Sequence, residues 1–189
     1  HSNKVKEMKS YLNRMGIIWY PKTYHKILIG KFFDFINLFM TSTFILMTKQ
    51  ISIIHCRSYI PSMSTFILKK FFKIKYIFDI RDFWADEGLE IKKYKFIYAF
   101  FKKMEGKMIN DASKIVCLTQ SAKKYIIYKY KKKYESIFDE KISVIPCGTD
   151  FSLFNPSNFK KNKICILKKR LNLNNKKVLL YYGSIGKNY

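Results

Sequence analysis

Acidic residues are scarce in this chain. Its 189 residues include 13 Asp and Glu against 37 Lys and Arg, which gives a formal net charge of +24. This balance favours anionic partners: nucleic acid, anionic lipid headgroups or phosphorylated substrates. An AT-rich genome would produce the same abundance of Lys, Ile, Asn, Phe and Tyr without any such partner. The charge therefore leaves the function open.

Cysteine and histidine are also sparse and scattered. The four cysteines contain no C-x-x-C pair, and no two of the three histidines lie four residues apart. This spacing excludes the common zinc and redox motifs and is typical of reduced thiols in a cytoplasmic protein. We expect no metal and no cofactor. The chain opens with neither Met nor a secretory signal, and we expect it to be a piece of a longer protein.

Long apolar runs are missing as well. Residues 35–48 (FINLFMTSTFILMT) form an uncharged segment of 14 residues, flanked by Lys31 and Asp34. A membrane-spanning helix needs about 20 such residues. We therefore predict a buried helix that packs on a sheet.

Helical and strand-like patterns alternate along the chain, each marked by apolar residues at helical spacing or by a short β-branched run. The predicted helices cover residues 3–15, 31–49, 61–72, 92–110, 121–134 and 163–171, and the predicted strands cover residues 17–20, 51–56, 75–80, 114–118, 141–145 and a run that begins at 177. Alternating elements with short connections predict a parallel sheet covered on both faces. This is a doubly wound, Rossmann-like α/β fold.

A strand-like run stops at a proline within residues 142–156 (ISVIPCGTDFSLFNP). Pro146 cannot donate to a strand ladder and Gly148 permits positive φ, so the chain turns here. The string resembles the interdomain crossover of family 4 glycosyltransferases, whose two-domain architecture is called GT-B. The resemblance implies an acceptor-side Rossmann-like domain over residues 1–157, without its first strand, and a truncated donor-binding domain over residues 158–189.

Charged residues gather in the string FDIRDFWADE, directly after a predicted strand. Open α/β sheets bind ligands at the carboxyl ends of their strands. Arg81 offers five donors to a phosphate or carboxylate, and Trp84 is suited to stack on a sugar. Three carboxylates would accept hydrogen bonds from sugar hydroxyls: Asp82, Asp86 and Glu87. A solvated loop with helix-capping acids is the alternative interpretation.

This string resembles the D-x-R-G-F-W-A-D-E motif of a bacterial subgroup of family 4, with Asp82 in place of the usual Gly. In the wider family a His stands at the Arg81 position and contacts the transferring sugar. The resemblance therefore implies Arg81 as the catalytic residue. An arginine cannot act as a base near neutral pH, whereas electrostatic stabilisation of a departing phosphate suits its chemistry.

Two further strings resemble the same subgroup. HCRSY ends a predicted strand and is similar to H-A-R-S-Y, which implies substrate contacts by His55, Arg57 and Ser58. For His55 alone, a core histidine with a satisfied hydrogen bond is the alternative. The string YHK resembles the Y-H-K segment of the subgroup and adds His25 as a substrate-binding residue, with a surface turn as its alternative.

Near its end the chain contains the string GSIG, which follows a strand-like run. It resembles the glycine turn that opens the donor domain of the family, where backbone amides approach a diphosphate. The resemblance assigns donor phosphate binding to Gly183, Ser184 and Gly186. An ordinary strand-to-helix turn is the alternative.

The resemblance implies a hexosyltransferase-like enzyme that moves a sugar from a nucleotide-diphosphate sugar to a saccharide or lipid-linked acceptor in cell-envelope glycan synthesis. Retention of anomeric configuration, without a metal, is the family expectation. We expect a cytoplasmic protein with no nucleic-acid partner that contacts the inner face of the plasma membrane through basic and aromatic stretches such as residues 69–73. The chain alone is expected to be inactive, because most of the donor site is missing.

A non-enzymatic basic α/β module that binds nucleic acid or anionic membrane is the competing interpretation. The net charge of +24 favours it. The sequence contains no zinc-finger, RRM or KH signature, which weighs against it. A sugar-nucleotide epimerase would need an early G-x-x-G-x-x-G turn, and the sequence does not contain one.

Overall fold

The computed structural model describes residues 2–90, 94–135, 137 and 139–181. The chain divides into two compact units, residues 1–146 and 147–189. All of the described strands belong to the first unit. The domain boundary that the sequence predicts at residue 157 stays a prediction.

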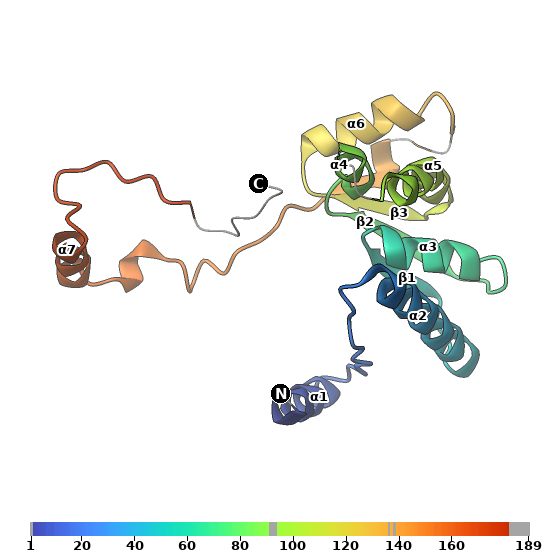
Figure 1. Ribbon diagram of the computed structural model, residues 1–189, viewed down its shortest axis with the longest axis horizontal. Coiled ribbons are helices and arrows are strands. Elements are labelled where there is room, and N and C mark those ends of the chain that lie inside the picture. Colours follow the sequence, from blue (N-terminus) through green and yellow to red (C-terminus); the bar gives the residue numbers. More distant parts are fainter. Residues whose placement is uncertain (1, 91–93, 136, 138, 182–189) are drawn as a thin grey trace. The chain divides into compact units, whose positions relative to one another are not determined.

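The first unit consists of alternating helices and strands (Figure 1). In chain order they are α1 (Ser2–Arg14), α2 (Leu28–Thr48), β1 (Ile53–Arg57), α3 (Tyr59–Leu68), β2 (Lys75–Ile80), α4 (Trp84–Glu90), α5 (Lys95–Asp111), β3 (Lys114–Cys117), α6 (Gln120–Tyr130), η1 (Asp139–Lys141) and β4 (Ile142–Val144). The described residues of the second unit contain η2 (Pro156–Asn158) and α7 (Lys161–Arg170).

The four strands form one parallel sheet in the order β1-β2-β3-β4. The register pairs Cys56 with Phe78, Phe78 with Ile115, and Ile115 with Ile142. A row of buried side chains therefore crosses one face of the sheet. The predicted α/β class with a Rossmann-like parallel sheet is confirmed.

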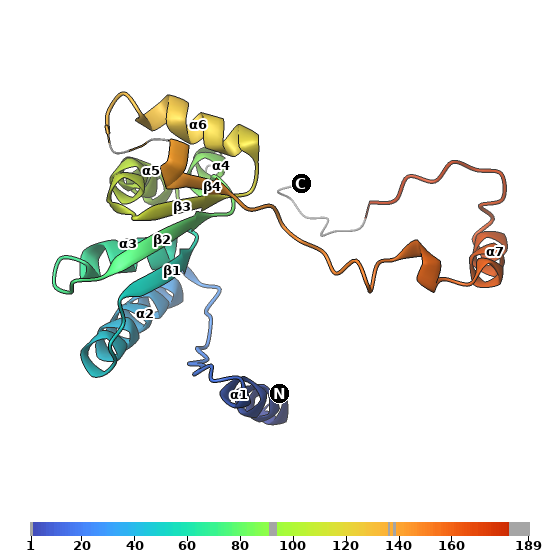
Figure 2. The ribbon, with the colours of Figure 1, turned by 180° about the vertical axis from the view of Figure 1, so that it is seen from behind.

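Three helices cover this buried face. Tyr59 and Met63 of α3, Met108 and Ile109 of α5, and Ile126 of α6 pack with the strand residues in one apolar core. Burial of apolar surface is the main favourable term in folding, at about 25 cal/mol per Å². In the view from behind, the strands lie in front of α3 and α5 (Figure 2).

The opposite face of the sheet carries the alternate side chains, and several of them are exposed: His55, Lys75, Lys114 and Ser143. The prediction that helices cover both faces is wrong for the described residues. Right-handed crossovers between strands in sequence order all place their helices on the same side. Covering the second face requires a reversal of the strand order.

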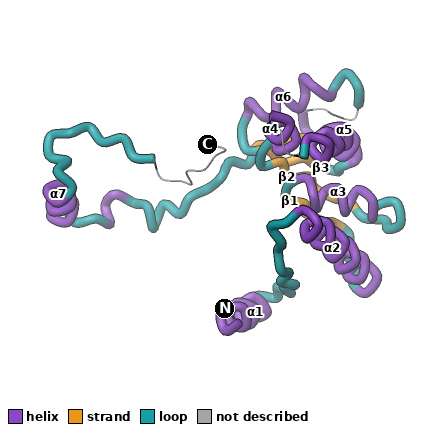
Figure 3. The backbone as a smooth tube through the Cα atoms, viewed as in Figure 1, coloured by secondary structure: helices purple, strands orange, loops and turns teal. Residues whose placement is uncertain are grey.

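Residues 17–27, between α1 and α2, carry no helix or strand (Figure 3), so the strand predicted over residues 17–20 is wrong. The amide of Ile17 instead donates to the carbonyl of Leu12 at 2.9 Å. Gly16 has a φ of 74°, the left-handed conformation that commonly ends a helix. A β-branched run forms a strand only beside a ladder partner, and no described strand pairs with this one.

Helix α2 packs against α3 but contains no buried residue. An apolar stripe along α2 is exposed: Ile29, Phe33, Ile36, Met40, Phe44 and Met47. The prediction of a buried helix is therefore wrong, because no described element covers this stripe. Among the described residues, α2 is the one helix that is long and apolar enough to cross a membrane, judged by length and composition.

In the second unit, residues 177–181 form no strand. The predicted strand that begins at 177 is therefore wrong for these residues, since none of the described strands pairs with them. The rest of that prediction, together with Gly183, Ser184 and Gly186, lies outside the described residues.

Candidate functional site

The carboxyl ends of β1 and β2 bring together four of the predicted site residues: His55, Arg57, Ser58 and Arg81. The parallel register places Arg57 opposite Asp79, and His55 precedes Arg57 by two positions. Alternate residues of a strand share one face, so these three side chains lie on the uncovered face of the sheet. Ser58 and Arg81 directly follow the two strands.

Asp79 connects this group. Its carboxylate is buried, with the residue only 5% exposed. Oδ2 lies 3.2 Å from His55 Nε2, and Oδ1 lies 3.6 Å from Arg81 Nη1. Sequence reasoning did not include Asp79 among the site residues, although a carboxylate within the apolar strand KYIFDI was a visible signal.

Ser58 joins β1 to α3 through a strained backbone. Its φ of 70° and ψ of −176° lie in a region that is almost restricted to glycine. The Ser58 amide donates to the carbonyl of Asp79 at 2.8 Å, and its own carbonyl accepts a hydrogen bond from Ser62 Oγ at 2.8 Å. Strain of this kind persists only where the surrounding structure maintains it, and strained residues cluster at functional sites.

The charges at this sheet edge suit an anionic ligand. The Arg81 guanidinium lies 3.6 Å from the Asp79 carboxylate, and Arg57 occupies the register position opposite Asp79 on β1. Guanidinium groups remain charged at physiological pH and bind phosphate or carboxylate through paired N–H donors. The Arg57 side chain is exposed, and that of Arg81 is 26% exposed.

The other residues of the FDIRDFWADE string point elsewhere. Asp82 is exposed between β2 and α4, and Glu87 is exposed in the first turn of α4, where a carboxylate is favoured by the helix dipole. Trp84 packs edge-to-face against Tyr98 and Phe101, with ring centroids 4.8 and 5.2 Å away. The substrate roles of Asp82, Trp84 and Glu87 stay predictions.

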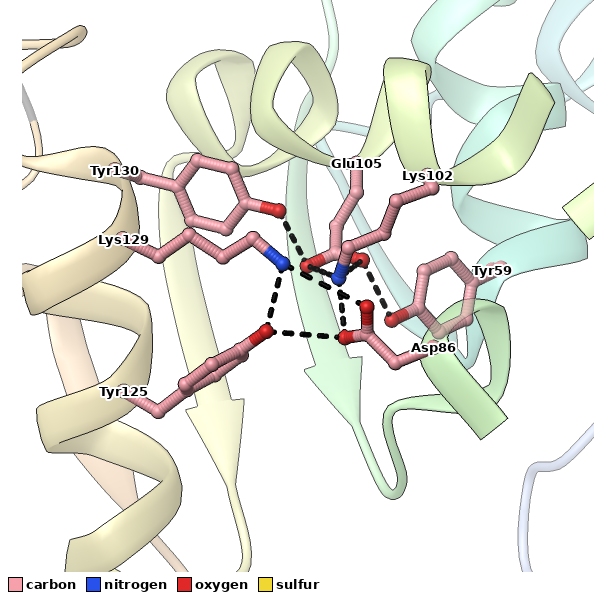
Figure 4. Close-up of polar contacts among 7 residues, drawn as sticks. All are labelled: Tyr59, Asp86, Lys102, Glu105, Tyr125, Lys129 and Tyr130. Atoms are coloured by element: carbon pink, nitrogen blue, oxygen red, sulfur yellow. Dashed lines mark hydrogen bonds and ion pairs between the residues drawn. The ribbon is translucent and has the colours of Figure 1, made fainter. Parts of the chain in front are cut away.

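Asp86 belongs to a polar network between α3, α4, α5 and α6 (Figure 4). Its carboxylate accepts a hydrogen bond from Lys102 Nζ and another from Tyr125 OH at 3.1 Å. Lys129 Nζ lies 3.6 Å from Asp86 Oδ1. The network therefore occupies this carboxylate with intramolecular partners, and its contact with substrate stays a prediction.

Glu105 anchors the same network from a fully buried position. It accepts hydrogen bonds from Tyr59 OH at 3.1 Å, from Tyr130 OH at 2.6 Å and from Lys102 Nζ at 2.9 Å. Periodicity gave no signal of this network, because its members are dispersed over four helices.

Burial and neighbouring charges shift several pKa values in the network. Burial raises the pKa of Asp86, but its hydrogen bond and ion pair with Lys102 outweigh that effect and hold the pKa below its usual range. Burial and the positive charge of Lys102 lower the pKa of Lys129. Burial and the charge of Glu105 raise the pKa of Tyr59 and Tyr130.

His25 lies outside both groups. Its ring Nδ1 is 2.7 Å from Asp34 Oδ1, and its amide donates to Asp34 Oδ2 at 2.8 Å. These bonds fasten the loop before α2 to the first turns of that helix and lower the pKa of Asp34. A substrate contact by His25 stays a prediction.

No group of three or more His, Cys, Asp or Glu side chains among the described residues could hold a metal ion.

Comparisons with known proteins identify similar chains. The family model described as Glycosyltransferase Family 4 matches residues 13–153. The crystal structure of a glycosyltransferase from Rickettsia africae ESF-5 aligns with a TM-score of 0.47 and 18% sequence identity. The alignment covers 87% of this chain and 38% of that one, so the chain spans well under half of that protein. No curated protein matches.

Proposed function

The chain belongs to glycosyltransferase family 4, and on this premise we propose that it forms the acceptor-side part of an enzyme with GT-B architecture. The enzyme transfers a sugar, with retention of configuration, from a nucleotide-diphosphate sugar to a saccharide or lipid-linked acceptor in cell-envelope glycan synthesis. Gly183, Ser184 and Gly186 would contribute to binding of the donor phosphates. No metal takes part in this proposal.

One observation supports the proposal most directly: His55, Arg57, Ser58 and Arg81 meet at the carboxyl edge of two neighbouring parallel strands. This edge is where open α/β folds bind ligands. The residues present charged donors, a histidine and a hydroxyl near this edge of the sheet, a combination suited to a phosphorylated or hydroxyl-rich ligand.

We assign Arg81 the stabilisation of the departing phosphate. Its guanidinium stays protonated throughout the reaction, so it can compensate negative charge that develops on the leaving group but cannot remove a proton. Asp79 at 3.6 Å limits the directions that the guanidinium can adopt. Arg57 would add a second positive charge on the acceptor side.

The test is the binding of inorganic pyrophosphate to this chain, followed by calorimetry. We expect Arg81→Gln to weaken binding by about tenfold or more, since one charge-assisted hydrogen bond contributes roughly 1.5–3 kcal/mol. Arg14→Gln, which removes an exposed arginine from α1, is the matched control and should leave the affinity unchanged. Equal losses in both variants would show that pyrophosphate responds only to the overall charge.

Sugar transfer is tested by the release of nucleoside diphosphate from a panel of nucleotide sugars. We expect no turnover by the 189-residue chain by itself, and turnover when it is joined to a donor-binding Rossmann-like domain. Robust turnover by the chain alone would contradict the proposed division of the two sites.

A second proposal concerns location: the exposed stripe of α2 contacts an anionic membrane. The stripe is apolar, and the apolar face of a helix normally packs against a covering layer. Between Glu7 and Asp79 the sequence contains eleven Lys and Arg and a single acidic residue, Asp34. Apolar contact combined with positive charge is the usual basis of peripheral binding to anionic lipids.

Vesicle sedimentation tests this contact, with phosphatidylcholine vesicles that contain or lack phosphatidylglycerol. We expect Met40→Glu, in the stripe, to reduce binding to the anionic vesicles severalfold more than Gln50→Glu, an equal charge change just beyond the helix. Equal effects of the two substitutions on vesicle binding would show that the stripe of α2 does not contact the membrane. Steeply salt-dependent binding to duplex DNA would instead favour the nucleic-acid module.

A further inference from the structure

The geometry points to Asp79 as a positioning residue that orients both His55 and Arg81. Its two carboxylate oxygens serve different partners: Oδ2 lies 3.2 Å from His55 Nε2 and Oδ1 lies 3.6 Å from Arg81 Nη1. These partners come from different segments of the chain. One buried carboxylate therefore determines the relative placement of the two side chains.

Several features distinguish this carboxylate from a surface charge. Its side chain is 7% exposed, whereas that of His55 is 60% exposed. Oδ1 is buried and has no hydrogen-bond partner among the described residues, so its ion pair with Arg81 compensates its charge there. A buried carboxylate without such a partner would be strongly disfavoured. The pairing holds the guanidinium near the sheet edge.

The backbone of Asp79 contributes as well. Its carbonyl accepts the hydrogen bond from the Ser58 amide at 2.8 Å and so maintains the strained turn after β1. Side chain and main chain of this residue thus organise three of the predicted site residues: His55, Ser58 and Arg81.

The carboxylate also selects the protonation pattern of the imidazole. A neutral histidine beside a carboxylate carries its proton on the nitrogen that faces it. We therefore assign the Nε2–H tautomer to neutral His55, which leaves Nδ1 as an acceptor. Such an acceptor can take a hydrogen bond from a hydroxyl of the ligand; this step and the pyrophosphate readout rest on the proposed function.

The experiment compares the wild-type chain with Asp79→Asn. Asp111→Asn is the matched control, because Asp111 also has one buried oxygen without a hydrogen-bond partner and a lysine ion pair, with Lys69 at 2.8 Å. The first readout is the ring ¹⁵N shifts of His55 at a pH where it is neutral. We expect the Nε2–H form to dominate in the wild type and in Asp111→Asn, and a mixture of tautomers in Asp79→Asn.

The second readout is pyrophosphate affinity, which separates positioning from charge. If Asp79 only neutralised nearby cations, its removal would strengthen anion binding, since the site would become more positive. A positioning role predicts the opposite sign, a loss of about tenfold. Unchanged or tighter binding in Asp79→Asn would overturn the role toward Arg81, and an unchanged tautomer would overturn the role toward His55.

The two proposals fail in different ways. A wild-type chain that binds no pyrophosphate would count against the phosphate site of the proposed function. In that case the tautomer of His55 would still determine whether Asp79 orients the imidazole.

Discussion

The hydroxyl of Tyr59 donates a 3.1 Å hydrogen bond to Glu105 Oε2, although the two residues are 46 positions apart. Tyr59 is the first residue of α3, directly after the strained Ser58, and Glu105 lies within α5. The bond therefore ties the beginning of α3, next to the candidate site, to the buried network between the helices. We expect the stability of this network to influence the geometry of the site.

Glu105→Ala should lower the free energy of unfolding by about 3–5 kcal/mol. The substitution leaves the hydroxyls of Tyr59 and Tyr130 and the ammonium of Lys102 without their common acceptor in a buried position. Urea unfolding followed by circular dichroism measures the change. Glu140→Ala, at an exposed position, is the control and should change the stability by less than about 0.5 kcal/mol.

Asp86 should contribute stability that depends on pH. Because its pKa is lower in the folded chain than in the unfolded chain, its contribution is complete above the unfolded pKa of about 3.9 and is lost as the pH falls through the folded value. The difference in unfolding free energy between wild type and Asp86→Asn should therefore shrink below about pH 4. A difference that stays constant from pH 7 to the acid limb would contradict this assignment.

Gly88→Ala should destabilise the packing of α4 on α5. A Cβ at this position would overlap Cδ1 of Tyr98, whose ring packs against Trp84. Because the overlap is severe, we expect the forced shift to cost about 3 kcal/mol, which exceeds the gain of about 1 kcal/mol in helix propensity. Gly148→Ala is the control, since a Cβ added there would have no atom within 4 Å. Near-ultraviolet circular dichroism would report the displacement of Trp84.

Ser58→Gly should stabilise the chain by about 1 kcal/mol, because glycine adopts the observed φ and ψ without the steric cost that a side chain incurs. Ser58→Ala keeps a Cβ and should not gain this stability. Thermal unfolding of both variants measures the difference. A stabilised alanine variant would show that the backbone conformation is not the source of the strain.

The regular elements of the sheet and its helices were largely predictable from local pattern. Strand β2 begins and ends where the β-branched run predicts, and α5, α6 and α7 lie within a few residues of the predicted helices. Helix α4 was missed because its seven residues are too short to show a helical period. The strand at residues 17–20 was predicted wrongly, because a short run of residues that favour strands does not reveal whether a partner strand is present.

The candidate site was predictable in part. His55, Arg57, Ser58 and Arg81 follow or end predicted strands, and strands that run parallel place such residues at one edge. Asp86 carried the same local signal, yet its carboxylate points toward Lys102 and Tyr125. Local pattern cannot distinguish a residue at the sheet edge from one in the network between the helices, because in both cases a charged residue follows a predicted strand.

Composition and periodicity were sufficient to establish a basic α/β chain with parallel strands, since these properties depend on residues that are close in sequence. The partners of Asp79 and Glu105 required the folded chain. His55 and Asp79 are 24 residues apart, and Tyr59 and Glu105 are 46 apart. Such pairs form only when strand register and helix packing bring distant segments together. The fold class could therefore be predicted from the sequence, whereas these hydrogen bonds could not.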